Sequence, residues 1–235
     1  MTLFDLDLGE YQIRIQKKHI KHIYFKLDPR QKKLVVSVPF GVGEDAIHQA
    51  VLSRYGWIKR RIQRAQCLPE PVVISTYADE TVVSVWGREC RFRLETAEGR
   101  PQVDHSDGKL VLLIGNGRLD DSEYHRKMVE TWYRRELTRS VRDQVEKWQP
   151  VIGVKVREYR VRKMRTRWGS CNTRAKRIWL NLALIHLEPA FLEYVVIHEM
   201  VHLLEPGHNK RFRQFMDRFL PHWPQLKHQL DRIYL

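Results

Sequence analysis

The segment Val-Ile-His-Glu-Met-Val-His, from Val196 to His202, combines the residue types of a hydrolytic metal site. His198 and His202 are four residues apart, so on a helix they lie about 40° apart around the axis and about 6 Å apart along it. Both imidazoles can therefore reach one metal ion. Glu199 projects beside that ion and can accept a proton from a bound water without being a ligand. The order predicts two ligands and a general base.

A third ligand is expected downstream, because a catalytic zinc ion usually has three protein ligands and one open position. His208 is the preferred candidate, since Pro206 and Gly207 break the helix just before it and let the chain turn back towards the ion. Glu205 is the local rival. The spacing also fits the metzincin pattern HExxHxxGxxH, but Glu205 stands where that pattern has glycine, so we reject metzincin membership. One zinc ion per chain is expected.

The residues of this site lie in a predicted helix that opens at Pro189, a favoured first-turn position for proline, and reaches Leu204. Apolar residues surround most of its circumference, which predicts that it is buried. Burying two imidazoles and a carboxylate costs free energy, which favours a functional role. The alternative interpretation is a chance motif whose histidines are merely hydrogen-bonded in the core.

The other elements of the C-terminal half must position this helix. A long helix is predicted from Asp121 or Ser122 to about Trp148, ended by Pro150 and Gly153. Two strands should follow, near 155–161 and 178–185, and after the catalytic helix we expect a helix over 209–219 and another short one before residue 235. The aromatic residues Trp132, Tyr133 and Trp148 are interpreted as core, and His222 and His228 as surface residues.

The N-terminal half is predicted to be rich in β-structure. A hairpin is expected from 11–27 and 34–38, around a turn at 28–31, followed by an amphipathic helix over 44–66. Further β-like runs lie at 72–75, 82–94 and 110–114. The predicted fold class is α+β, with a β-rich N-terminal region at 1–117 and a catalytic domain at 118–235.

Composition sets the broad class of protein. The 235 residues are 43% hydrophobic, which suffices for a real core. No signal peptide and no apolar stretch of about 20 residues is visible, so we expect a cytoplasmic protein without a membrane partner. The cysteines Cys67, Cys90 and Cys171 form no CxxC pair, which argues against a disulfide framework and a thiolate zinc cluster.

The net charge of +14 favours association with polyanions. The segment 155–177 holds ten basic residues and one acidic residue, a net +9. Such a segment can contact phosphates of DNA or another polyanion, although a solvated basic face is the simpler interpretation. The candidate phosphate contacts are Arg160, Arg162, Lys163, Arg174, Lys176 and Arg177.

Several motifs in combination resemble a known family. They are Arg167-Trp168-Gly169-Ser170-Cys171, Leu180-Asn181, His198–Leu203, His208 and Phe212, preceded by the basic hairpin and by Gly56-Trp57-Ile58. Over most of its length the sequence resembles the YgjP-like zinc metallopeptidases, which are related to the WLM and SprT-like groups of zincin-like peptidases. Val201, Asn209 and Arg213 differ from the residues that relatives commonly carry, which bears on substrate preference more than on chemistry.

The resemblance implies a zincin-like α+β catalytic half in which His198, His202 and His208 bind zinc. Zinc held by three imidazoles would lower the pKa of its water towards about 7, and Glu199 would take the proton and pass it to the leaving amine. The candidates for a donor to the developing oxyanion or the substrate are Arg165, Arg167 and Tyr194. SprT-like relatives suggest cleavage of DNA-associated proteins.

A peptide substrate requires a place to bind. The strand predicted at 178–185 could present an edge to which an extended peptide adds, or it could be an ordinary core strand.

Three other functions compete with the peptidase. The same site could hydrolyse a nucleoside triphosphate, with Arg165, Arg167 and Arg174 neutralising phosphate charge. A nucleic-acid-binding protein with structural zinc is disfavoured, because structural sites usually fill all four positions. A cysteine nucleophile at Cys171 is disfavoured, because it has no motif partner. No oligomeric state is predicted.

Overall fold

The computed structural model describes residues 3–7, 12–28, 33–66, 77–164 and 166–233. The chain forms two compact units, 1–70 and 71–233, each with a hydrophobic core of its own. The fold is mixed α+β, with most strands in the first half and most helices after it. The division at 70/71 corrects the predicted boundary at 117/118, because the sheet of residues 82–114 shares its core with the helices that follow.

The first unit is a four-stranded sheet with one helix on it. Its strands are β1 (Leu3–Asp7), β2 (Gln12–Lys18), β3 (Tyr24–Asp28) and β4 (Lys33–Pro39), in the order β1-β2-β4-β3, and its helix is α1 (Glu44–Gln66). The antiparallel pair β3–β4 is the predicted hairpin, whose turn lies mostly outside the described residues. The predicted first arm, 11–27, holds two strands, of which β2 runs parallel to β4.

The second unit begins with another four-stranded sheet. Its strands are β5 (Val82–Val85), β6 (Arg88–Thr96), β7 (Gln102–Ser106) and β8 (Lys109–Ile114), in the order β5-β6-β8-β7. The predicted run at 82–94 is a hairpin, and the run at 110–114 lies in β8, whereas 72–75 lies outside the described residues. A short 3₁₀ helix, η1 (Asn116–Arg118), leads to the long helix.

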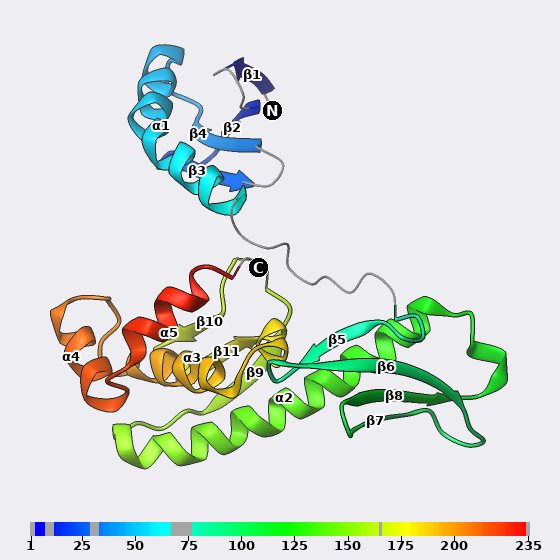
Figure 1. Ribbon diagram of the computed structural model, residues 1–235. Coiled ribbons are helices and arrows are strands. Elements are labelled where there is room, and N and C mark those ends of the chain that lie inside the picture. Colours follow the sequence, from blue (N-terminus) through cyan, green and yellow to red (C-terminus); the bar gives the residue numbers. More distant parts are fainter. Residues whose placement is uncertain (1–2, 8–11, 29–32, 67–76, 165, 234–235) are drawn as a thin grey trace. The chain divides into compact units, whose positions relative to one another are not determined.

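The long helix α2 (Ser122–Ile152) runs along both sheets of the second unit (Figure 1). Asp121 is its N-cap and accepts a hydrogen bond from the Tyr124 N–H at 3.0 Å. The prediction that Pro150 ends the helix was wrong. Pro150 lies in the last turn, where its missing N–H removes a single backbone bond, and the helix continues until Gly153 adopts a left-handed conformation with φ 78°.

The predicted catalytic domain contains a sheet of three strands, called the catalytic sheet after it: β9 (Glu158–Arg162), β10 (Gly169–Asn172) and β11 (Arg177–Asn181), in the order β10-β11-β9. The strand predicted at 178–185 was therefore too long. Its second half is the 3₁₀ helix η2 (Leu182–His186), because the side chain of Asn181 accepts a hydrogen bond from the Ala183 N–H and turns the chain. The central position of β11 also means that both its edges are already paired.

Three helices complete the second unit: α3 (Pro189–Val201), α4 (Lys210–Phe219) and α5 (Trp223–Leu230). The predicted catalytic helix is α3, which ends at Val201, three residues before the predicted end, with His202 as its C-cap. The helix predicted at 209–219 and the last short helix are confirmed as α4 and α5.

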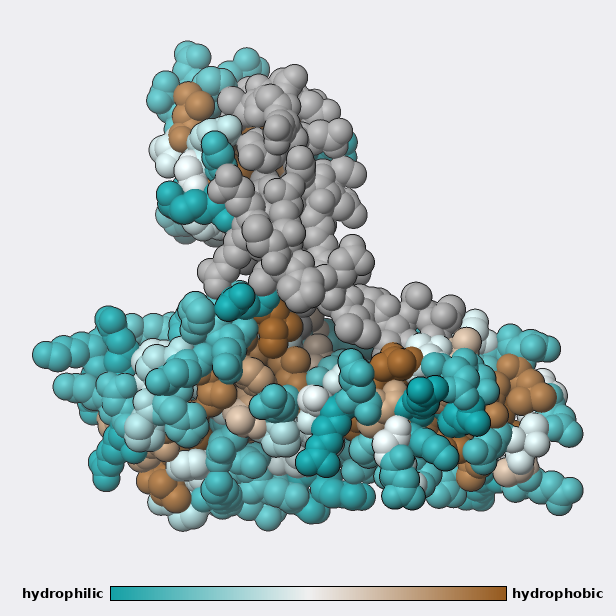
Figure 2. Space-filling view, viewed as in Figure 1, coloured by the Kyte–Doolittle hydropathy of each residue, from teal (hydrophilic) through white to brown (hydrophobic). Residues whose placement is uncertain are grey.

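Hydrophilic side chains cover much of the visible surface (Figure 2), as the net charge of +14 leads one to expect. Among the described residues, no helix combines the length and the apolar character that crossing a membrane requires.

Candidate metal centre and active site

Helix α3 is buried on nearly every side. Its apolar residues pack against α2, β10, β11, α4 and α5, and several of them have no exposed surface. His198 is half-buried and Glu199 is 5% exposed, so both polar side chains are held inside this packing. The helix therefore fixes the direction in which each of them points.

The three predicted ligands meet at the C-terminal end of α3. His198 and His202 have ring centroids 4.9 Å apart, and His208, from the segment before α4, lies 5.0 and 4.7 Å from them. One nitrogen from each ring lies within 4.8 Å of the others, and Nε2 of His208 lies 3.0 Å from Nε2 of His198. The carboxylate of Glu205, the rival ligand, is not part of this cluster. The structure thus brings together the set that the sequence favoured.

This cluster fits a small divalent metal ion. Nitrogens about 2.1 Å from one tetrahedral ion are about 3.4 Å apart, close to the separation of the two Nε2 atoms. Burial and the neighbouring imidazoles lower the pKa of His198 to about 3, and burial lowers the pKa of His202, so both rings are neutral, as ligands must be. His202 donates from Nδ1 to the carbonyl oxygen of Glu205 at 3.2 Å, which leaves its Nε2 for the ion.

Phe212 lies against all three imidazoles. Its ring centroid is 5.0, 4.8 and 4.8 Å from those of His198, His202 and His208, and its side chain is 2% exposed. Asn209 caps α4 by accepting the Phe212 N–H at 3.0 Å. The sequence marked Phe212 only as part of a family motif. Phe212 contacts the site because α4 packs against α3.

Glu199 is pressed against the backbone of β10. A Cβ atom added to Gly169 would lie 2.6 Å from Oε1 and 2.8 Å from Cγ of Glu199, and 2.9 Å from Cγ1 of Val195. Only glycine allows this approach. Burial raises the pKa of Glu199 to about 8, although the nearby charge of Arg167 opposes the shift. The carboxyl group is therefore held in one place with little contact to water.

Asn181 anchors the chain that leads into β10. Its Nδ2 donates to the carbonyl oxygens of Met164 at 2.7 Å and Arg167 at 2.9 Å, and its backbone N–H donates to Trp168 at 2.8 Å. The side chain is 2% exposed, so these bonds compete little with water. Sequence reasoning used Asn181 only as a motif residue and missed this role, which helps to place Gly169 beside Glu199.

The candidate oxyanion donors have different environments. Arg167 is exposed and acts electrostatically on Glu199, whereas Tyr194 is buried, with its ring 5.8 Å from that of His198. Burial, with the charges of Asp231 and Glu199, raises the pKa of Tyr194. Arg165 lies outside the described residues.

Cys171 is a half-buried thiol on β10. Burial and the charge of Glu199 raise its pKa to about 12, so it is not a thiolate at neutral pH. The low weight given to a cysteine nucleophile agrees with this environment.

The predicted phosphate contacts do not form one free patch. Arg160 forms an ion pair with Glu158, and Lys163 forms one with Glu130. Arg162 stacks on Trp179, with its Cζ atom 4.2 Å from the ring centroid. All six residues are exposed except Arg177, which is half-buried. His222 and His228 are exposed, as predicted.

Comparisons with known proteins identify one family and two similar solved structures. The model of the family described as YgjP-like, metallopeptidase domain, matches residues 21–233. Among solved structures, the chain is similar to the metallopeptidase zymogen abylysin of Pyrococcus abyssi, with 21% identity, a TM-score of 0.36, and coverage of 38% of this chain and 90% of that one. It is also similar to the zymogen jannalysin of Methanocaldococcus jannaschii, with 14% identity, a TM-score of 0.36, and coverage of 39% and 94%. No curated protein matches.

Proposed function

Because this chain belongs to the YgjP-like metallopeptidase family, whose members are metal-dependent hydrolases, we propose that it cleaves peptide bonds with one zinc ion held by His198, His202 and His208. The observation that supports this proposal best is the meeting of three imidazoles beside one buried carboxylate. A set of three neutral nitrogens suits zinc and leaves one position open for a reactant.

A zinc ion bound there would supply a Lewis acid that acidifies water and polarises a carbonyl oxygen. The histidines come from two segments: His198 and His202 lie at the C-terminal end of α3, and His208 lies in the turn before α4. The hydrogen bond from His202 to the Glu205 carbonyl sets the orientation of that ring.

Glu199 is proposed as the general base. It follows His198 on the same helix, and Gly169 and Val195 fix the direction of its carboxylate. A zinc ion beside it would favour the ionised form against the burial that raises its pKa. The carboxylate then takes a proton from the attacking water and later delivers that proton to the nitrogen of the leaving amine.

The substrate is proposed to bind along β10. The catalytic sheet has two outer strands, β9 and β10. On β9, the Val161 carbonyl already accepts a hydrogen bond from Nη1 of Arg134 on α2, at 2.7 Å. Strand β10 pairs only with β11 among the described strands, and it begins beside Glu199. An extended peptide that adds to β10 would therefore pass the general base. This strand replaces β11 as the proposed edge.

Arg167 is the better candidate for stabilising the oxyanion. Its exposed guanidinium can turn towards a substrate beside Glu199, whereas the side chain of Tyr194 is only 5% exposed. Replacing Arg167 with Met should lower kcat by about a hundredfold, and Tyr194→Phe should change it little. Equal losses in the two variants would contradict this assignment.

DNA-associated proteins are proposed as one class of substrate. The support is the exposure of Arg174 and Lys176 and the net charge of +14, which attracts polyanions. Added DNA should then stimulate cleavage of a DNA-binding protein at low salt but not at high salt.

The deciding experiment compares zinc-loaded wild type with Glu199→Gln on an unstructured protein and, in parallel, on a nucleoside triphosphate. We expect protein cleavage by the wild type, a loss of at least about a hundredfold in the variant, and equal zinc content in both. Unchanged turnover in Glu199→Gln would exclude the mechanism. Hydrolysis of the nucleotide alone, dependent on Glu199, would show a phosphohydrolase instead.

A further inference from the structure

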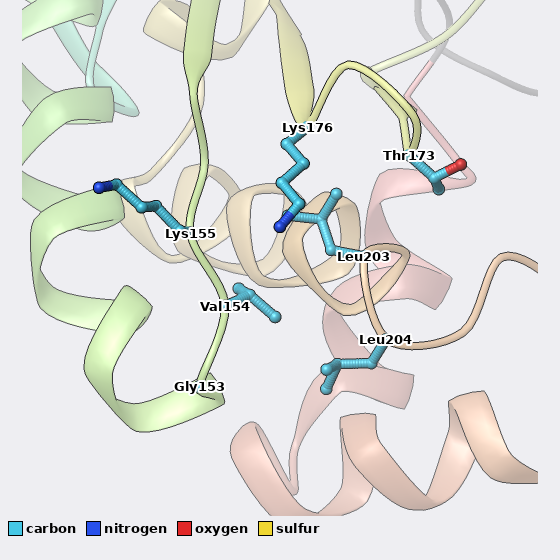
Figure 3. Close-up of a pocket in the computed structure, with 7 residues that line it drawn as sticks. All are labelled: Gly153, Val154, Lys155, Thr173, Lys176, Leu203 and Leu204. Carbon is cyan, nitrogen blue, oxygen red and sulfur yellow. The ribbon is translucent and has the colours of Figure 1, made fainter.

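A hollow of about 530 Å³ opens beside the C-terminal end of α3 (Figure 3). Its wall comes from the end of α2, the turn between β10 and β11, and the two leucines that follow His202. The lining residues are Gly153, Val154, Lys155, Thr173, Lys176, Leu203 and Leu204. The volume is in the range of sites that hold a small ligand or a short piece of a larger one.

The lining of the hollow includes both apolar side chains and lysines. Leu203, Leu204 and Val154 are half-buried, whereas Lys155 and Lys176 are exposed. Figure 3 shows the Lys176 side chain extending from its turn towards Leu203, with Lys155 on another wall. Neither lysine forms an ion pair or a side-chain hydrogen bond with any residue that the structure describes.

Backbone N–H groups cap one carbonyl at each of the two nearby helix ends. The carbonyl of Gln149 near the end of α2 accepts the N–H groups of Gly153 and Val154. At the end of α3, the carbonyl of Val201 accepts those of Leu204 and Glu205. At least one carbonyl at each of these helix ends is thus bonded by the backbone, and Lys176 has no side-chain partner among the described residues.

The turn that carries Lys176 is fixed. Asn172 accepts the Ala175 N–H at 2.9 Å, and the carbonyl of Lys176 accepts the Arg157 N–H at 2.8 Å. Lys176 has φ +50°, a conformation that costs a side-chain-bearing residue about 1 kcal/mol. The hydrogen bonds on both sides hold the lysine in this strained position, with its side chain directed at the hollow.

The hollow lies at the far end of the proposed substrate strand. Strand β10 begins at Gly169, beside Glu199, and Thr173 of the hollow follows its last residue. Four residues of extended chain span about 13 Å, so a peptide paired with β10 covers the same path in about four residues.

We propose that this hollow is a substrate subsite that takes an acidic side chain, aspartate or glutamate, three to four residues from the scissile bond. The carboxylate pairs with Lys176, and the methylene groups pack on Leu203 and Leu204. This subsite rests on the proposed peptidase function, because it presumes a peptide lying along β10.

The test uses the zinc-loaded full-length protein and a peptide library whose cleavage sites are read by mass spectrometry. Aspartate and glutamate should be enriched at one position, three to four residues to one side of the cleaved bond. In Lys176→Glu the preference at that position should change to lysine and arginine, with a change of about fivefold in the ratio of kcat/KM for matched acidic and basic peptides. Lys109→Glu is the control, since it makes the same charge change at an exposed site on β8.

A second measurement separates the subsite from the reaction. Binding of acidic and basic versions of one labelled peptide is measured with zinc-loaded Glu199→Gln, alone and combined with Lys176→Glu. Tighter binding of the acidic peptide that is lost in the double variant would support the subsite. Absence of cleavage by the wild type would then count against the peptidase function and not against the subsite. Cleavage or binding without acidic preference, or equal changes in Lys176→Glu and Lys109→Glu, would overturn the subsite and leave the peptidase standing.

Discussion

At the scale of single residues, the candidate site depends on positions where a larger side chain would not fit. Gly169 is one of them, because its missing side chain is what lets β10 approach Glu199. The HExxH spacing predicted two of the candidate ligands and the candidate base, since four residues on a helix define a direction in space. No spacing could show that Gly169 lies against Glu199, because they are 30 positions apart in the chain and the contact arises only when sheet and helix pack.

Gly169→Ala should therefore impair catalysis more than metal binding. The new methyl group would lie 2.6 Å from Oε1 of Glu199, so the carboxylate must shift. Misplacement by about 1 Å can lower kcat by about a hundredfold, and the overpacking should cost about 1–3 kcal/mol of stability. Peptide cleavage and zinc content are measured together.

Gly117→Ala is the matched control for this substitution, because nothing lies within 4 Å of the added atom. It should cleave like wild type. Normal kcat in Gly169→Ala, or loss of zinc in proportion to activity, would argue against a role for Gly169 in placing the base.

Phe212 acts on the same site from α4. Phe212→Ala removes the ring that touches all three imidazoles, and we expect zinc affinity to fall by about 10–100-fold, as when other residues that orient metal ligands are lost. Phe212→Leu should recover part of this loss. The measurement is zinc competition with a chromophoric chelator, with thermal unfolding of the zinc-free proteins alongside.

Phe215→Ala controls for a general loss of packing on α4, because Phe215 stacks on Phe219 and is only half-buried. It should bind zinc as wild type does. If both variants bind zinc equally well, Phe212 is a packing residue with no special effect on the ligands.

At the scale of elements, the turn of the β5–β6 hairpin docks on the chain just before α3. Trp86 donates its N–H to the Ile185 carbonyl at 2.7 Å, and Ser84 exchanges two hydrogen bonds with His186. Gly87 faces Glu188, the N-cap residue of α3. This contact ties the sheet β5–β8 to the start of α3.

Gly87→Ala should accordingly weaken the second unit. Gly87 has φ +76°, and an added Cβ would lie 2.6 Å from Cγ of Glu188 and 3.0 Å from its backbone nitrogen. We expect a loss of about 2–4 kcal/mol in the free energy of unfolding, from the positive φ and the clash together. Urea denaturation of the zinc-free protein measures it.

Gly108→Ala separates the two causes, because Gly108 has φ +70° but nothing within 4 Å of the added atom. It should lose only the conformational part, about 1 kcal/mol. Equal losses in the two variants would show that docking on Glu188 contributes nothing.

The elements show where sequence patterns succeed and where they fail. Periodicity placed α1, α2, α3 and α4 to within a few residues, since an apolar stripe is a property of the segment itself. The strand at 178–185 was half wrong because the apolar run Leu182–Ile185 does not distinguish a strand from a 3₁₀ helix, and the side chain of Asn181 decides between them.

At the scale of the whole molecule, the chain holds two separate cores. The buried residues of the first core lie within residues 13–58, and those of the second core lie within residues 77–230. The two cores share no buried residue. The sequence placed the boundary at 117/118, because the strands of the two sheets look alike in composition. Which sheet belongs to which core is decided by packing on α2 and η2, where the β5–β8 sheet lies.

This division predicts how truncated chains behave. A chain of residues 71–235 keeps the entire second core and all the proposed ligands, so it should fold, bind zinc within about threefold of the full-length affinity and unfold in one cooperative transition. A chain of residues 118–235 loses the sheet β5–β8 and uncovers Val129, Trp132 and Tyr133 on α2, so it should aggregate or remain molten. Circular dichroism, calorimetry and zinc titration of the two chains make the comparison. If the shorter chain folds and binds zinc as well as the longer one, the sheet β5–β8 is dispensable to the catalytic core, and the boundary at 117/118 is the correct one after all.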